Sequence, residues 1–250
     1  MKGTVISIVV PDDLEQQVNA AVQFFWATRD NQTSTGYSGK ARDVGNRSAV
    51  TGGKQLDGFL ALLKGLLVEN GVQEDSIFSN ANIELPGYYR PTKKWDLLVV
   101  DKSKLVAAIE LKSQVGPSFG NNFNNRTEEA MGSALDLWTA YREGVLLDTN
   151  SPWLGYLLLL EDCPEASKPV AVRSRHFKAM KEFDNASYIE RYRIFCSKLV
   201  LERQYSAACF VTSKRNAGYS VPSEDLSPRK FIVSMLSAVL AHGAAKHGAV

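Results

Sequence analysis

A short run of apolar residues constrains the fold of this chain more than any other feature. Leu154–Leu160 consists mainly of leucine and contains no charge. A strand that is apolar on both faces has to be covered on both faces, as in the centre of a sheet between two helical layers. The run therefore predicts an α/β sandwich in which helices flank a central mixed β-sheet.

Hydrophobic periodicity supplies the helices of such a sandwich. Apolar residues recur at helical spacing in five segments, and capping residues mark several of their ends. The predicted helices run from Asp12 to about Trp26, from Leu56 to a stop at Asn70-Gly71, from Asn125 to Gly144, from Ser187 to about Gln204, and from Pro228 to His242.

Short β-branched and apolar segments alternate with these helices and predict the strands. Two of them are joined by the tight turn Asp101-Lys102-Ser103-Lys104, and they should pair as a β-hairpin. Stretches rich in Gly, Asn and Ser predict long loops at Gln32–Gly53 and Gly116–Asn125. The predicted strands are Ile77–Leu85, Trp95–Val100, Leu105–Leu111, Leu154–Leu160 and Ala207–Thr212.

Composition narrows the class of protein. No apolar stretch is long enough to span a bilayer, and the first residues lack a signal-peptide cleavage site. The 3 cysteines form no CxxC pair, which argues against a disulfide scaffold or a zinc site and fits a reducing cytosol. The net charge is only +2, yet residues 163–230 hold 13 Lys and Arg against 7 Asp and Glu, a difference of 6. This local excess fits a polyanionic partner or a solvated surface.

The predicted hairpin brings together the residues with the clearest chemistry. If its turn is centred between Lys102 and Ser103, Asp96 lies almost directly opposite Glu110, and Lys112 projects from the same face as Glu110. Two facing carboxylates repel each other, and a hard divalent cation such as Mg²⁺ removes that conflict. The alternative is a satisfied Glu–Lys ion pair, with Asp96 merely starting a strand.

The residues around this hairpin resemble one enzyme family. The segments Pro86–Val100 and Ala107–Ala130, and Asp57-Gly58-Phe59 after Gly52-Gly53-Lys54, are similar to the XhoI-type restriction endonucleases of the PD-(D/E)xK nuclease superfamily. The resemblance is strongest over residues 52–144. It differs from the superfamily name in that Trp95, not Pro, precedes Asp96.

The resemblance implies a restriction-endonuclease-like fold in one domain over residues 1–250, with a nuclease core at about 52–162. The N-terminal helix and the basic C-terminal region would elaborate that core. It also implies a type II enzyme that cuts double-stranded DNA at the palindrome CTCGAG and leaves 5′-phosphate ends with 5′ overhangs. Such an enzyme would work as a homodimer in the cytoplasm of a prokaryotic cell. ATP dependence is not expected, because the chain lacks a Gly-rich phosphate loop.

Roles in catalysis follow from the same resemblance. Asp96, Glu110 and the backbone carbonyl of Leu111 would hold Mg²⁺, and Lys112 would orient the attacking water. Relatives often add an acid from the helix before the hairpin. Asp57 is the candidate, Glu69 competes with it, and a solvated helix acid is the alternative for Asp57.

DNA contacts are predicted in two segments that follow Lys112 in the sequence. Asn and Arg side chains can read adenine and guanine bidentately, although Asn and Gly are also common loop formers. A second basic cluster, which includes His176 and Lys181, suits phosphate contacts better. Residues 32–54 could wrap the duplex or form ordinary surface. The rival classes are a repair nuclease of the same superfamily and a non-catalytic DNA-binding relative. The predicted DNA-binding residues are Ser113, Gln114, Asn121, Asn122, Asn124, Asn125, Arg126, Arg173, Arg175 and Lys178.

Overall fold

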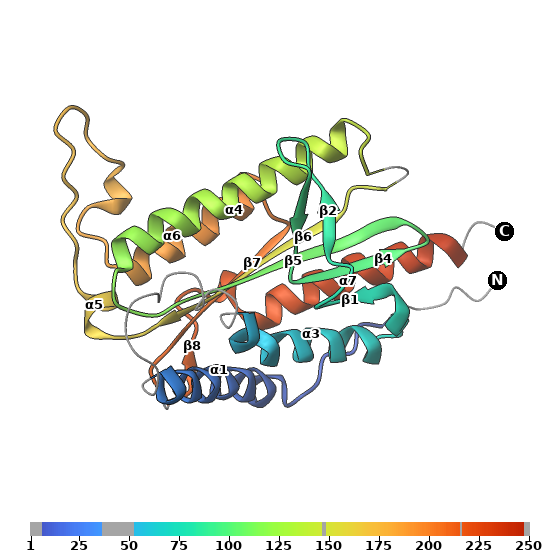
Figure 1. Ribbon diagram of the computed structural model, residues 1–250, viewed down its shortest axis with the longest axis horizontal. Coiled ribbons are helices and arrows are strands. Elements are labelled where there is room, and N and C mark those ends of the chain that lie inside the picture. Colours follow the sequence, from blue (N-terminus) through green and yellow to red (C-terminus); the bar gives the residue numbers. More distant parts are fainter. Residues whose placement is uncertain (1–6, 37–52, 147–148, 216, 248–250) are drawn as a thin grey trace.

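A six-stranded mixed sheet forms the centre of the computed structural model, which describes residues 7–36, 53–146, 149–215 and 217–247 (Figure 1). The strand order is β1-β4-β5-β6-β7-β8, and a separate hairpin pairs β2 with β3. The strands are β1 (Ile77–Phe78), β2 (Glu84–Pro86), β3 (Thr92–Lys94), β4 (Leu97–Asp101), β5 (Lys104–Gln114), β6 (Trp153–Glu161), β7 (Ala207–Ser213) and β8 (Tyr219–Ser220).

The apolar run occupies the middle of this sheet, as predicted. Strand β6 is parallel to both β5 and β7, while β1–β4, β4–β5 and β7–β8 are antiparallel pairs. Leu154 and Leu157–Leu160 are each no more than 3% exposed. The α/β sandwich with a central mixed sheet is therefore confirmed.

Helices cover both faces of the sheet. Figure 1 shows α4 and α6 above it and α1, α3 and α7 below it. Side chains alternate between two apolar clusters along each strand: Leu98 packs with the α4–α6 layer, whereas Leu97 and Ile109 pack with the opposite layer. The long helices are α1 (Leu14–Gly36), α3 (Asp57–Glu69), α4 (Phe119–Arg142), α6 (Tyr188–Leu201) and α7 (Pro228–His247). The short helices are η1 (Gly53–Leu56), η2 (Glu74–Ser76), α5 (Pro164–Ser167), η3 (Lys181–Phe183) and η4 (Glu224–Leu226).

The structure corrects the prediction for residues 116–125. Helix α4 begins at Phe119 rather than after Asn125, and its N-cap residue Ser118 is left-handed and makes no side-chain cap. Phe119 is 5% exposed, and the Phe123 ring packs against Tyr192 of α6. Burial of these two rings thus outweighs the weak helix propensity of the Asn and Gly residues between them. The predicted capping box at Asn125 does not exist.

Three other boundaries differ from the prediction. The strand predicted at Ile77–Leu85 is two short strands, because Asn80 and Asn82 take left-handed φ angles of 69° and 55° between them. Strand β3 was not predicted at all. Helix α1 continues to Gly36, so residues 32–36 of the predicted loop are helical, and residues 37–52 of that prediction lie outside the described residues.

Several local predictions are confirmed. The capping box of Ser187 and Glu190 opens α6. Gly71 and Gly144 take left-handed φ angles of 85° and 74° after α3 and α4, as C-terminal glycines commonly do. In the described part of the chain, no helix is both long enough and apolar enough to traverse a bilayer. The division into core and elaborations stays a prediction.

Candidate active site

The β4–β5 hairpin positions the two acids that the sequence singles out. Leu97 pairs with Ile109, and the backbone N–H of Asp96 donates to the carbonyl of Ile109 at 3.1 Å, which continues the register by one residue. Asp96 therefore enters the hairpin opposite Glu110. Its Oδ2 accepts a hydrogen bond of 2.7 Å from the backbone N–H of Leu111, so the next strand fixes the orientation of this carboxylate.

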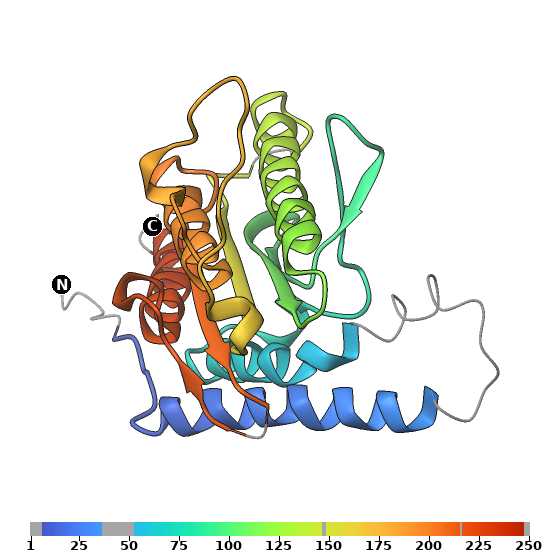
Figure 2. The same cartoon turned by 90° about the vertical axis from the view of Figure 1, so that its left-hand side faces the viewer.

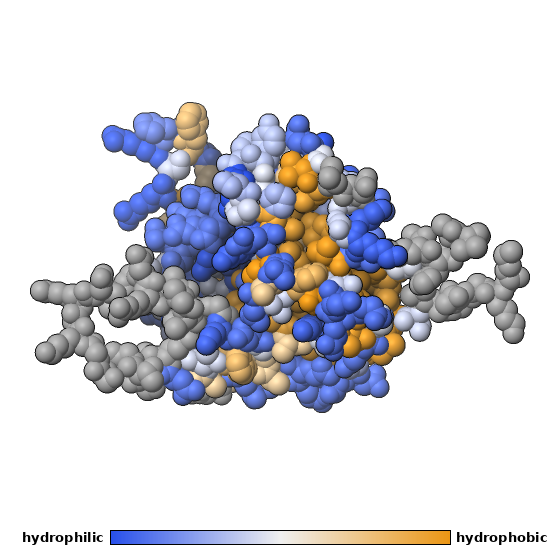
Figure 3. All heavy atoms as spheres, turned by 45° about the vertical axis from the view of Figure 1, so that its right-hand side comes forward, coloured by the Kyte–Doolittle hydropathy of each residue, from blue (hydrophilic) through white to orange (hydrophobic). Residues whose placement is uncertain are grey.

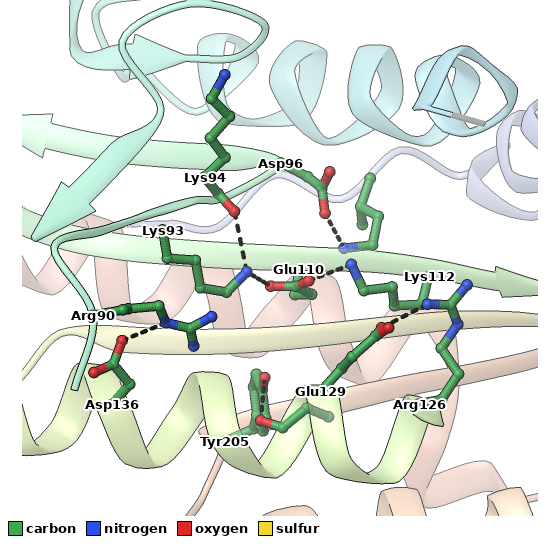
Figure 4. Close-up of polar contacts among 12 residues, drawn as sticks. Arg90, Lys93, Lys94, Asp96, Glu110, Lys112, Arg126, Glu129, Asp136 and Tyr205 are labelled. Atoms are coloured by element: carbon green, nitrogen blue, oxygen red, sulfur yellow. Dashed lines mark hydrogen bonds and ion pairs between the residues drawn. The ribbon is translucent and has the colours of Figure 1, made fainter. Parts of the chain in front are cut away.

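Glu110 is a buried carboxylate between two lysines. It is 3% exposed, and because its neighbours Ile109 and Leu111 pack with the opposite layer, it faces the α4–α6 side of the sheet. Lys112, two residues along β5, forms an ion pair with Glu110 Oε1. Lys93 of β3 approaches Oε2 at 2.5 Å, and Figure 4 shows the two ammonium groups on opposite sides of the carboxylate.

Electrostatics separates the two acids. Burial raises the pKa of Asp96, and the neighbouring charge of Glu110 raises it further. Burial would also raise the pKa of Glu110, but Lys112 and Lys93 outweigh it and hold that pKa below its usual value. Burial would lower the pKa of Lys112, yet the Glu110 carboxylate raises it, so Lys112 is held as an ammonium. The site thus combines an ionised glutamate with an aspartate that a nearby cation would help to ionise.

This donor set fits a hard divalent cation. Asp96, directly before β4, and Glu110 of β5 contribute carboxylate oxygens, and the Leu111 carbonyl lies between Glu110 and Lys112 on β5. Mg²⁺ is usually held by one or two carboxylates and completes its shell with water and substrate oxygens. Among the described residues no cluster of three His, Cys, Asp or Glu side chains forms, so a third acid does not join the pair.

The accessory acids predicted on the second helix lie on α3. Asp57 is its first residue and Glu69 its last, and α3 packs on the face of the sheet opposite to α4. Burial raises the pKa of Asp57, with Lys54 acting against it. The described hydrogen bonds and ion pairs do not join either acid to Asp96, Glu110 or Lys112.

The predicted DNA-reading residues fall on helix α4 and at the end of β5. Asn121, Asn124 and Asn125 are exposed on the first turns of α4, and Asn122 is half-buried. Ser113 is also half-buried. Gln114 is 3% exposed, accepts a hydrogen bond from the Tyr192 hydroxyl and donates to the Phe119 carbonyl at 3.3 Å. The Gln114 side chain is therefore part of the packing between β5, α4 and α6.

Arg126 lies beside the catalytic lysine candidate. Its Nη1 pairs with Glu129 at 2.6 Å, and its Nη2 reaches the Ser113 carbonyl at 3.5 Å. Its buried Nε has no hydrogen-bond partner. The guanidinium is close enough to Lys112 to act on the pKa of that ammonium. Figure 4 shows Arg126 on α4 next to Lys112.

Sequence reasoning missed the support that the β2–β3 hairpin gives to the site. Asp136 of α4 is buried and accepts the backbone N–H groups of Tyr88 and Tyr89 at 2.9 and 2.7 Å, and it pairs with Arg90 Nε at 2.7 Å. These bonds fix the tip of the β2–β3 hairpin, which Figure 2 shows beside α4. Strand β3 carries Lys93 from that tip to Glu110. The acid at position 136 was the available signal for this support. Its partners stand 46 to 48 positions earlier in the sequence, so no local pattern connects them to it.

The second predicted DNA-binding cluster lies apart from the acids. Arg173, Arg175 and Lys178 are exposed in the loop between α5 and η3, which we call the basic loop (residues 168–180). Figure 1 shows it projecting beyond the end of the molecule where α4 begins. Phe177 within it is 83% exposed.

A mixed sheet with helices on both faces, carrying two acids and a lysine on one hairpin, defines a nuclease of the restriction-endonuclease-like fold. Residues 34–222 match the family described as restriction endonuclease XhoI. The chain belongs to this family, and it is accordingly a type II restriction endonuclease.

Similar proteins carry the same designation. The chain is 51% identical to the type II restriction enzyme BstVI of Geobacillus stearothermophilus over 212 residues, which cover 81% of this chain and 95% of that enzyme. It is 48% identical to XhoI of Xanthomonas vasicola over 76% of this chain and 77% of that enzyme. It is 46% identical to AbrI of Azospirillum brasilense over 68% and 76%, respectively. No solved structure matches the chain.

Proposed function

We propose that this enzyme makes Mg²⁺-dependent double-strand cuts at CTCGAG and leaves 5′-phosphate ends with 5′ overhangs. The observation that carries the proposal is the buried Glu110, which is flanked by Lys112 on its own strand and by Asp96 across the hairpin. The proposed recognition sequence rests on the resemblance to XhoI, at 48% identity to the Xanthomonas enzyme.

Each residue of the site has a definite part in this reaction. Asp96, Glu110 and the Leu111 carbonyl would hold the metal. A bound Mg²⁺ supplies Lewis-acid stabilisation of the phosphate charge. Lys112 orients the attacking water and stabilises the charge that develops on the phosphate in the transition state. Attack in line with the leaving oxygen gives the 5′-phosphate and a 3′-hydroxyl.

Asp57 is proposed as the accessory acid, because it begins the helix that precedes the hairpin. Its place on the other face of the sheet means that it would act at the edge of the site rather than as a direct partner of Glu110. Glu69, at the far end of the same helix, is the competing candidate. Comparison of Asp57→Asn with Glu69→Gln in cleavage assays separates the two.

The DNA partner is proposed to contact two regions. Arg126 and the exposed asparagines of α4 would read bases near the cut, and the basic loop would hold phosphates. Ser113 would contribute from the end of β5. Gln114 would contribute by positioning α4, because its side chain is buried against Phe119 and Tyr192. The protein is proposed to work without ATP, in the cytoplasm of a prokaryotic cell.

A homodimer is proposed because each chain carries one such site and a palindrome has to be cut on both strands. Met131 and Leu135 lie one turn apart on α4 and are 49% and 48% exposed. Figure 3 shows apolar surface between hydrophilic margins on the face turned forward, and such surface can be covered by a partner subunit. Sedimentation that finds one chain per duplex during concerted cleavage of both strands would contradict the dimer.

The proposed function is tested by digesting a plasmid that carries one CTCGAG site, with Mg²⁺ and with a chelator, followed by sequencing of the ends. The expected result is a single linear product that forms only with Mg²⁺, with 5′ overhangs inside the palindrome. A matched plasmid with one altered base pair in the site should stay intact. Cuts at unrelated sequences would favour the repair-nuclease alternative, and binding without cleavage would favour a non-catalytic relative.

A further inference from the structure

Both oxygens of the Glu110 carboxylate are already held by lysine ammonium groups. Lys112 pairs with Oε1, and Lys93 lies 2.5 Å from Oε2 (Figure 4). The Glu110 side chain is 4% exposed, so water offers it little alternative solvation. A cation that binds to Glu110 therefore competes with the two ammonium groups for these oxygens.

The two lysines are not equally free to leave. Lys112 is on the same strand as Glu110 and takes its position from the six-stranded sheet. Lys93 comes from β3, which pairs only with β2 in a separate two-stranded sheet. Its Nζ also donates to the Lys94 carbonyl at 3.0 Å and lies 4.5 Å from the centre of the Trp95 ring. These contacts can keep the ammonium close by after it leaves Glu110.

Glu110 has positively charged partners in the absence of a metal. Lys93 and Lys112 each place an ammonium group beside one of its oxygens. Buried carboxylates that lose a charged partner are costly, so a metal-free site of this kind needs an internal cation. When a divalent ion enters and both lysines stay near, the site gains positive charge that suits an incoming phosphate.

We infer that Lys93 is the internal counterion of the active site: in the metal-free enzyme its ammonium takes the place beside Glu110 Oε2 that the divalent ion occupies later, and metal binding displaces it. The inference rests on the proposed function, because it takes Glu110 to be a metal ligand. It gives Lys93 a role in metal loading that no motif spacing indicates. Lys93 is therefore a positioning residue, which acts through the Glu110 carboxylate.

The test is a titration of the DNA-free enzyme with Mn²⁺, an ion that takes the same oxygen ligands as Mg²⁺. The electron paramagnetic resonance signal of free Mn²⁺ monitors how much of the ion is bound. In Lys93→Met the competing ammonium is gone, while the aliphatic stem can still pack on Trp95. We expect Lys93→Met to bind Mn²⁺ about five- to tenfold more tightly than the wild type. Lys94→Met removes the neighbouring lysine, whose side chain is 73% exposed, and should leave the affinity unchanged.

Three outcomes are distinguishable. Unchanged or weaker Mn²⁺ binding in Lys93→Met would overturn the role of Lys93. Glu110→Gln that binds Mn²⁺ as well as the wild type would overturn the metal assignment of the proposed function instead. If Lys93→Met does not fold without metal, Lys93→Gln keeps a hydrogen-bond donor beside Glu110, and the same titration on that variant decides the question.

Discussion

The candidate active site and the basic loop both carry positive charge, but that charge is buried in the first and exposed in the second. In the active site Lys93 and Lys112 are largely buried and paired with Glu110. In the basic loop Arg173, Arg175 and Lys178 are exposed, and no ion pair within the described residues holds them. Buried, paired charges are positioned and can act on one phosphate, whereas exposed charges act on a polyanion at any position along it. Substitutions in the first region should therefore change chemistry and specificity, and those in the second should change general affinity.

The largest effect on cleavage is expected from substitution of Asp96 or Glu110. Glu110→Gln or Asp96→Asn should reduce the cleavage rate at least about a thousandfold, because each variant removes a charged ligand from the proposed metal site. Specific DNA binding in Ca²⁺ should survive. Single-turnover cleavage and gel-shift assays measure the two properties. Glu84→Gln, a change of an exposed acid on β2, is the control, and near-normal cutting by Glu110→Gln would remove Glu110 from the chemistry.

The next effect concerns the support of the β2–β3 hairpin. Asp136→Asn replaces a charged acceptor of three hydrogen bonds by a neutral one and should cost about 1.5–3 kcal/mol of unfolding free energy at neutral pH. It should also slow cleavage, because Lys93 follows the tip of this hairpin. Urea unfolding and cleavage assays on the same preparations measure both effects.

The pH dependence of stability checks the role of Asp136 independently. Burial opposes ionisation of Asp136, but the Arg90 guanidinium and the two backbone N–H groups outweigh it and lower its pKa. A lowered folded-state pKa means that the stabilisation is complete above the unfolded value of about 3.9 and is lost as the pH falls through the lower folded value. The difference in stability between wild type and Asp136→Asn should therefore shrink in that acidic range. A constant difference would show that the charge of Asp136 is not the cause.

A smaller and more selective effect is expected at Arg126. If Arg126 reads a guanine, Arg126→Ala should lose about 1–3 kcal/mol of binding free energy on the cognate duplex and little on a scrambled one. Its neighbour Glu129 provides a control, since Glu129→Gln frees the guanidinium of its ion pair without removing it. Fluorescence anisotropy on both duplexes in Ca²⁺ is the measurement. Equal losses on the two duplexes would make Arg126 a phosphate or structural contact.

The smallest effect should come from the basic loop. Lys178→Ala should weaken binding to the cognate and scrambled duplexes by a similar free energy, about 0.5–1 kcal/mol. It should also reduce the slope of log affinity against log salt by about 1. Lys102→Asn removes one charge from the exposed β4–β5 turn and should leave the slope unchanged. A loss confined to the cognate duplex would give the basic loop a part in reading sequence and break the contrast between the two regions.

Local signals in the sequence were sufficient for much of the fold. The apolar run predicted the central strand β6, Ser187 and Glu190 predicted the start of α6, and the turn at Lys102-Ser103 predicted the β4–β5 hairpin. Each of these signals depends on residues a few positions apart. The start of α4 could not be predicted in this way, because burial of Phe119 and Phe123 against α6 decided it.

The candidate site divides along the same line. The hairpin and the two-residue period of a strand determine that Asp96 faces Glu110 and that Lys112 shares its side, so the sequence alone determined this trio. Only the tertiary structure decided that Lys93 covers the other oxygen of Glu110, that Asp136 anchors the hairpin that carries Lys93, and that Arg126 comes to lie beside Lys112. These contacts join separate elements, and their formation depends on how a helix and a second hairpin pack on the sheet, which no local pattern specifies.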